Sequence, residues 1–165
     1  MIAIPRRAWA AYALALVVIV LDQWIKSWIL ADLLHAPGLS LPVWGPLRFT
    51  LVANNGVSFG FFQSQASWTR WALAGFSLVV TAALAVWAAR ADKAFTALTL
   101  GLIMGGAVGN LIDRITHGAV VDFVDVRALH FPWIFNLADS AISVGVALLL
   151  VESLFTPGVA ERRKA

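Results

Sequence analysis

Residues 105–141 read GGAVGNLIDRITHGAVVDFVDVRALHFPWIFNLADSA and place four aspartates in or beside strongly apolar sequence. These are Asp113, Asp122, Asp125 and Asp139. An ionised carboxylate next to hydrocarbon costs about 2.5–3.5 kcal/mol on membrane-insertion scales, so such residues usually have a function or a charged partner. The stretch therefore predicts a membrane setting with a polar site in it.

The composition is that of an integral membrane protein. Of the 165 residues, 61% are hydrophobic and 13% are charged, and the mean hydropathy is +0.83. A soluble domain of this size has too much surface to carry so much apolar sequence. The chain has no cysteine, which excludes disulfides, thiolate nucleophiles, Cys-bound metals and a lipid attached to its own Cys. The net charge of +3 is modest and does not indicate nucleic-acid binding.

Hydropathy predicts a mainly α-helical chain with four transmembrane helices in a single membrane domain, residues 1–165. The first apolar run follows Arg6 and Arg7 like a signal peptide, but it is too long and has no convincing cleavage site. We therefore expect it to remain as a membrane span. The predicted spans are residues 9–30, 68–89, 94–112 and 136–155.

A segment rich in Pro and Gly, residues 31–67, separates the first two spans. Residues 47–53 favour a β-strand, and the Asn-Asn-Gly sequence at 54–56 favours a tight turn into residues 57–62. We therefore expect a small extracytoplasmic β-ribbon, or cradle, between helices one and two. Its apolar side chains either form a mini-core or contact lipid or a lipidated substrate.

The basic residues predict the orientation of the chain in the membrane. Seven of the twelve Lys and Arg residues lie at the termini or in and directly beside the turn predicted at residues 91–93. Because short cytoplasmic segments carry an excess of positive charge, we expect both termini in the cytoplasm. The ribbon and a loop predicted at residues 113–135 then meet on the extracytoplasmic face, together with the aspartates.

Two of the carboxylates are expected to form an acid–base pair. Carboxylates about 3 Å apart cannot both ionise, so the pair holds one shared proton. Such a pair takes a proton from water and gives one to the substrate, which hydrolyses a peptide without a metal or a covalent intermediate. Asp139 lies in the first turn of the last predicted span. Asp122 is its expected partner, although spacing alone does not choose between Asp122 and Asp125.

Each of these residues also has a structural interpretation. Asn136-x-x-Asp139 resembles a capping box at a helix start, with Asp in place of the usual Glu. Asp122 and Asp125 are compatible with ordinary loop carboxylates that face water.

Other functions have weaker support. Asp22 and Lys26 lie four residues apart in the first span, and we expect them to form a structural ion pair. A Ser–Lys dyad that uses Lys26 is disfavoured because Asp22 keeps Lys26 charged. The three histidines are dispersed and H-E-x-x-H is absent, so no metal site is expected. A proton-coupled transporter and a noncatalytic membrane scaffold remain as alternatives.

Five motifs, in the same order along the chain, resemble those of lipoprotein signal peptidase (signal peptidase II), a family of bacterial intramembrane aspartyl proteases. The motifs are Asp22 with Lys26, NNGVSFGFF from residue 54, GGAVGNLIDR from 105, VVDFVDV from 120 and FNLADSAI from 135. The resemblance covers almost the whole chain. It implies an endopeptidase that removes the signal peptide from diacylglyceryl-modified prolipoproteins by cutting just before the lipidated cysteine.

The resemblance also implies which residues do this. Asp122 and Asp139 would be the catalytic pair. A separate hypothesis is that the apolar ribbon, with Phe59 and Phe61, holds the substrate over the active site. The implied supporting residues are Asn54, Gly106, Asn110, Arg114 and Asn136.

No metal and no cofactor are expected, and the expected partners are lipid-modified prolipoproteins and membrane lipids, not nucleic acid. We expect a multi-pass monomer in the bacterial cytoplasmic (inner) membrane, with its active site near the extracytoplasmic face.

Overall fold

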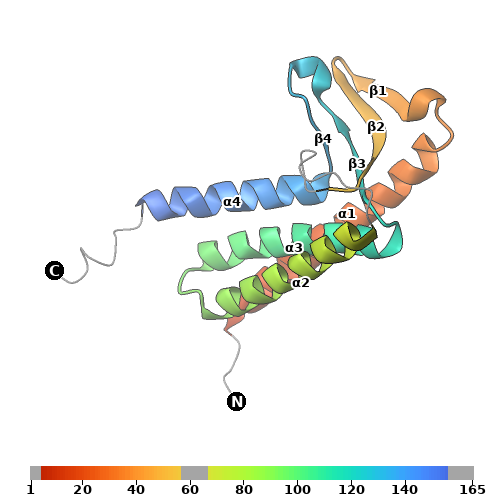
Figure 1. Ribbon diagram of the computed structural model, residues 1–165. Helices are drawn as coiled ribbons and strands as arrows, with labels where there is room; N and C mark the ends of the chain where they lie inside the picture. The colour runs from red at the N-terminus through yellow and green to blue at the C-terminus, as the bar shows by residue number, and fades with distance from the viewer. Residues whose placement is uncertain (1–4, 57–66, 156–165) are drawn as a thin grey trace.

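Four long helices form the framework of the computed structural model, which describes residues 5–56 and 67–155 (Figure 1). All four are long and apolar enough to cross a membrane. Their outward faces are apolar too, since Trp24, Phe76 and Leu150 are each more than 60% exposed. The four-helix membrane fold predicted from hydropathy is confirmed. The helices are α1 (Arg6–Leu33), α2 (Ser67–Arg90), α3 (Ala94–Thr116) and α4 (Leu137–Phe155).

Helix α3 is the centre of the bundle. Of its apolar window 61% is buried, against 11% to 28% for the other three helices. Its glycines Gly101, Gly105 and Gly109 face α1: an added Cβ would lie 2.6 Å from the Ala11 carbonyl oxygen at Gly101 and 2.6 Å from Asp22 Oδ2 at Gly109. This stripe of small residues therefore brings the backbones of the two helices close together.

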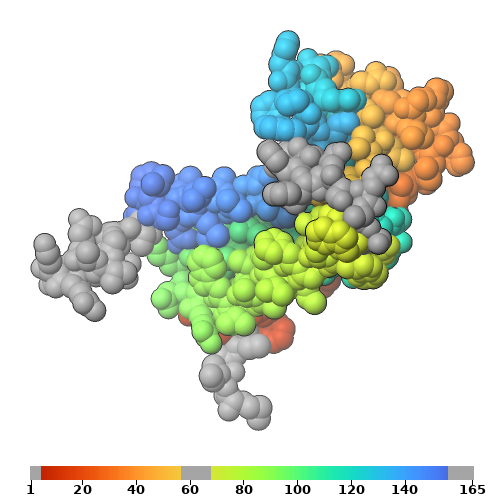
Figure 2. All heavy atoms as spheres, viewed as in Figure 1, coloured from red at the N-terminus to blue at the C-terminus, as the bar shows by residue number. Residues whose placement is uncertain are grey.

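A four-stranded antiparallel sheet lies at one end of the bundle and stands out from it (Figures 1 and 2). Its order is β1-β2-β3-β4. Two strands come from the segment between α1 and α2, and two from the segment between α3 and α4, so the sheet joins distant parts of the chain. The strands are β1 (Ser40–Trp44), β2 (Leu47–Asn54), β3 (Val120–Asp125) and β4 (Ile134–Phe135), with the short 3-10 helices η1 (Pro37–Leu39) and η3 (Arg127–Leu129).

The sheet contains the predicted ribbon and extends it. The ribbon between α1 and α2 is present as the antiparallel pair β1 and β2, and β2 also pairs with β3 on its other edge. The loop predicted at residues 113–135 is wrong in part, because α3 continues to Thr116 and is followed by β3, η3 and β4. Residues 57–62, with Phe59 and Phe61, lie outside the described part of the chain.

A small apolar core fastens the sheet to the end of α1. Ile29 and Leu33 of α1 pack with Phe123 of β3, and Phe49 and Leu51 of β2 pack against this cluster. The Phe49 and Phe123 rings meet edge to face with their centroids 5.7 Å apart. For Phe49 and Leu51 the mini-core interpretation is therefore correct, and this core holds β3 beside the bundle.

Candidate active site

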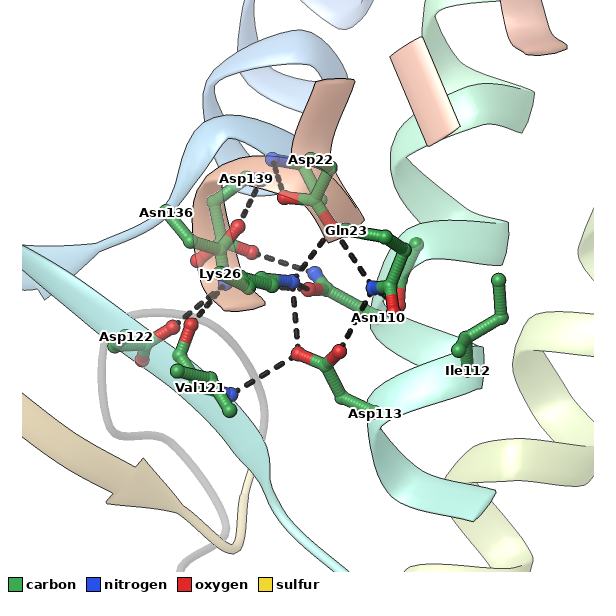
Figure 3. Close-up of polar contacts among 12 residues, drawn as sticks. Asp22, Gln23, Lys26, Asn110, Ile112, Asp113, Val121, Asp122, Asn136 and Asp139 are labelled. Atoms are coloured by element: carbon green, nitrogen blue, oxygen red, sulfur yellow. Dashed lines mark hydrogen bonds and ion pairs between the residues drawn. The ribbon is translucent and has the colours of Figure 1, made fainter. Parts of the chain in front are cut away.

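A cluster of buried polar side chains fills the place where β3 meets α1, α3 and the start of α4 (Figure 3). Every member is at most 7% exposed. Polar groups so far from water must bind one another, because an unpaired buried charge is very costly. The members are Asp22, Lys26, Asn54, Asn110, Asp113, Arg114, Asp122, Asn136 and Asp139.

Asp122 lies on β3 and is held by two amides. Its Oδ1 accepts a hydrogen bond from Asn136 Nδ2 at 2.7 Å, and its Oδ2 accepts one from Asn54 Nδ2 at 2.9 Å. Asn54 ends β2 and Asn136 directly precedes α4. The carboxylate is therefore fixed between the sheet and the last helix.

The environment of Asp122 favours its protonated form. Burial, reinforced by the nearby Asp139 carboxylate, raises the pKa of Asp122 to about 7, although the hydrogen bonds from Asn54 and Asn136 and the charge of Lys26 act in the opposite direction. A carboxyl group with this pKa can gain and lose a proton near neutral pH, as an acid–base catalyst must.

Asp139 lies in the first turn of α4 and belongs to the same cluster. Its Oδ1 accepts a hydrogen bond from Asn110 Nδ2 on α3 at 2.8 Å. Its backbone N–H donates to Asn136 Oδ1 at 2.8 Å, so Asn136 caps the helix. The capping interpretation thus holds for Asn136. Because the Asn136 side chain also binds Asp122, one residue connects the two aspartates.

Asp125 has a different setting. Its carboxylate accepts hydrogen bonds from Arg127 at 2.7 and 2.9 Å and from Thr50 Oγ1 at 2.8 Å. The Arg127 guanidinium lowers the pKa of Asp125 below its usual range despite the burial of the carboxylate. A carboxylate held ionised in this way is a poor partner for sharing a proton. The geometry therefore favours Asp122 over Asp125, a choice that spacing left open.

The other predicted supporting residues, Gly106 and Arg114, also border the cluster. An added Cβ at Gly106 would overlap the backbone carbonyl oxygen of Ala138, so this glycine lets the first turn of α4 approach α3. Arg114 donates to the backbone carbonyl oxygens of Gly56 at 2.7 Å and of Asn110 at 3.3 Å. Its contacts are thus with the main chain around the site.

The ion pair between Asp22 and Lys26 is present, with 2.7 Å between Oδ2 and Nζ. Sequence reasoning missed its further partners. Lys26 Nζ also lies 2.8 Å from Asp113 Oδ2, and Gln23 Nε2 donates to Asp113 Oδ1 at 2.9 Å. Asp113 was conspicuous as a carboxylate in apolar sequence, but its partner lies on another helix. Nothing in the sequence pointed to Gln23 as part of the site.

Comparison with known proteins supports an enzyme. The model of the signal peptidase (SPase) II family matches residues 14–155. A lipoprotein signal peptidase of Caulobacter vibrioides is 53% identical over 156 residues, which cover 94% of this chain and 92% of that protein. Another, of Methylobacterium sp. (strain 4-46), is 45% identical over 148 residues, which cover 87% and 88% of the two chains.

Solved structures share the fold. A bacterial membrane enzyme determined by the in meso method at 2.3 Å resolution matches with a TM-score of 0.74 at 30% identity, over 87% of each chain. A second, at 1.9 Å resolution, matches with a TM-score of 0.71 at 31% identity, over 89% of this chain and 94% of the other. These matches decide against the transporter and scaffold alternatives. The chain belongs to the signal peptidase II family and is a multi-pass membrane peptidase of the aspartic type.

Proposed function

We propose that this peptidase removes the signal peptide from diacylglyceryl-modified prolipoproteins by cutting just before the lipidated cysteine, with a water molecule activated between Asp122 and Asp139. Removal of signal peptides from prolipoproteins is the activity of its family. The observation that supports the catalytic assignment is the double contact made by Asn136. Its side chain binds both the Asp122 carboxylate and the backbone N–H of Asp139.

The two carboxylates would divide the proton transfers. Asp122, with its raised pKa, carries the shared proton, and Asp139 takes a proton from water. The resulting hydroxide adds to the scissile carbonyl carbon while Asp122 protonates the carbonyl oxygen. In the second step the tetrahedral diol collapses, the C–N bond breaks, and the proton held by Asp139 passes to the leaving amine of the cysteine. The proton of the second diol hydroxyl returns to Asp122, which restores the starting state.

The proposed substrate suits the position of the site. The start of α1, the turn between α2 and α3, and the end of α4 lie at the end of the bundle away from the sheet (Figure 1). Arg6, Arg90 and Lys93 lie at that end, which the positive-inside rule assigns to the cytoplasm. The site then faces the outer surface of the bacterial cytoplasmic (inner) membrane, where the diacylglyceryl group of a precursor lies. We propose a monomer whose partners are these precursors and membrane lipids.

The substrate proposal is tested with purified protein in detergent and two forms of one precursor, with and without the diacylglyceryl group. We expect cleavage of the modified form alone, with mass spectrometry locating the cut directly before the lipidated cysteine. Equal cleavage of the unmodified form would contradict the proposed recognition of the lipid. Folded protein that cleaves neither form would contradict the proposed function.

The raised pKa of Asp122 predicts how kcat declines on the alkaline side of its pH profile. Because Asp122 must donate a proton, kcat should fall as the pH rises through about 7, where this carboxyl group ionises. Rates are measured on the modified precursor at saturating concentration in mixed buffers of constant ionic strength. A kcat that stays constant through neutral pH and above would show that Asp122 does not act as the acid.

A further inference from the structure

We propose that Asp22, Lys26 and Asp113 are positioning residues that set the spacing between Asp122 and Asp139. We call these three side chains the inner ion cluster. The inference rests on the proposed function, since it assigns a role relative to the two reacting carboxylates. It goes beyond a structural ion pair, because the cluster binds the main chain next to each of them.

The first arm of the cluster runs to β3. Asp113 Oδ2 lies 2.8 Å from Lys26 Nζ, and the same oxygen accepts a hydrogen bond from the backbone N–H of Val121 at 3.0 Å. Val121 directly precedes Asp122. A displacement of Asp113 would therefore move the strand at the position of the first reacting carboxylate.

The second arm runs to α4. Asp22 Oδ2 lies 2.7 Å from Lys26 Nζ, and Asp22 Oδ1 accepts a hydrogen bond from the backbone N–H of Ala138 at 2.9 Å. Ala138 directly precedes Asp139. One ammonium group thus holds two carboxylates, and each carboxylate holds the peptide N–H just before one reacting aspartate (Figure 3).

The third arm fixes the amide of Asn110. Lys26 Nζ donates to Asn110 Oδ1 at 3.2 Å, and Asn110 Nδ2 donates to Asp139 Oδ1 at 2.8 Å. Because an ammonium group is only a donor, the amide oxygen must face Lys26. The amide N–H₂ group is then turned to the Asp139 carboxylate.

Burial makes the cluster rigid. The side chains of Asp22, Lys26 and Asp113 are at most 2% exposed, so water does not screen their charges. Gln23 Nε2 adds hydrogen bonds to both carboxylates, at 2.9 Å to Asp113 and 3.3 Å to Asp22. Fully satisfied buried networks of this kind specify one arrangement more than they add stability.

The test uses Asp113→Asn and Asp22→Asn, which keep the side-chain shape but remove the charge that binds Lys26. We expect kcat per folded molecule to fall about 10- to 100-fold while KM changes less than about two-fold, because a small misplacement of reacting groups slows the chemical step. The alkaline limb of the pH profile should also shift to lower pH, because a more distant Asp139 carboxylate raises the pKa of Asp122 less.

The matched control is Glu152→Gln at the other end of α4. Glu152 accepts hydrogen bonds from Thr96 Oγ1 at 2.8 and 2.9 Å and pairs with Lys93 at 3.2 Å. Removal of the Glu152 charge should change the thermal stability of the protein. It should leave kcat per folded molecule and the pH profile of cleavage unaltered. If Asp113→Asn and Asp22→Asn behave in the same way, the cluster is only structural and the proposal is wrong.

A second measurement does not depend on cleavage. Infrared difference spectra against Asp122→Asn follow the titration of the Asp122 carboxyl group in wild type and in each variant. We expect this titration to move to lower pH in Asp113→Asn, and an unchanged titration would overturn the proposal even if wild type cleaves no precursor. Should Asp113→Asn fail to fold, Gln23→Met removes a neutral donor to both carboxylates of the cluster, together with its hydrogen bond to the Gly109 carbonyl oxygen. It should produce a smaller shift in the same direction, and the wild-type titration in this variant would overturn the proposal.

Discussion

Asp122→Asn and Asp139→Asn should each reduce cleavage of the lipid-modified precursor by about 10⁴-fold, because acid and base work as one unit and neither acts alone. Asparagine keeps the shape of the side chain but can neither take up nor release the proton. Cleavage is measured by gel shift on purified protein, with thermal unfolding in detergent as the check on folding.

Asp125→Asn is the matched control, because it makes the same change on the same strand. Asp125 lies three residues from Asp122 but is bound by Arg127 and Thr50. Its cleavage rate should stay within about three-fold of wild type, as expected for the loss of a partly exposed ion pair. Substantial activity in folded Asp122→Asn or Asp139→Asn would refute the catalytic pair, and loss in Asp125→Asn alone would reassign the partner of Asp139.

Gly106→Ala should have the second largest effect, although it adds one methyl group. The new Cβ would overlap the backbone carbonyl oxygen of Ala138, which cannot rotate away as a side chain could. The first turn of α4 must then move, and Asp139 moves with it. We expect a loss of about 1–3 kcal/mol of stability and a fall in kcat of about 100-fold.

Gly75→Ala on α2 provides the comparison. Among the described residues, no heavy atom lies within 4 Å of an added Cβ there. Alanine in a helix is favoured over glycine by about 0.5–1 kcal/mol, so this variant should be unchanged or slightly stabilised. Thermal unfolding and kcat are measured for both variants. Wild-type values for Gly106→Ala would show that α4 does not need this close approach.

Hydropathy was sufficient to predict the four helices because each apolar run is long enough to span a membrane by itself. The sheet was only half predictable. The strand at residues 47–53 carries a local signal, but its partner β3 lies far along the chain. In β3, Val120 to Phe123 are all buried, so the strand lacks the alternation that identifies a half-exposed strand.

The candidate site shows the same division between local and tertiary information. The aspartates were conspicuous because charge is rare in apolar sequence, and the contact between Asp22 and Lys26 follows from helical spacing. The choice between Asp122 and Asp125 depends on which side chains surround them. The side chains around Asp125 include Arg127, which lies only two residues away, so the sequence alone could have indicated this ion pair. The side chains that bind Asp122 are Asn54 and Asn136, which lie far from it in the sequence and meet it only in the folded chain.

The ion pair within α1 has a consequence for how the protein is made. Asp22 and Lys26 are one helical turn apart, so their charges can neutralise each other as soon as the first helix forms. Helix α1 can therefore enter the membrane during synthesis without waiting for Asp113 on α3. Because Asp139 lies in the first turn of α4, the proposed catalytic pair can be complete only after this last helix has been synthesised.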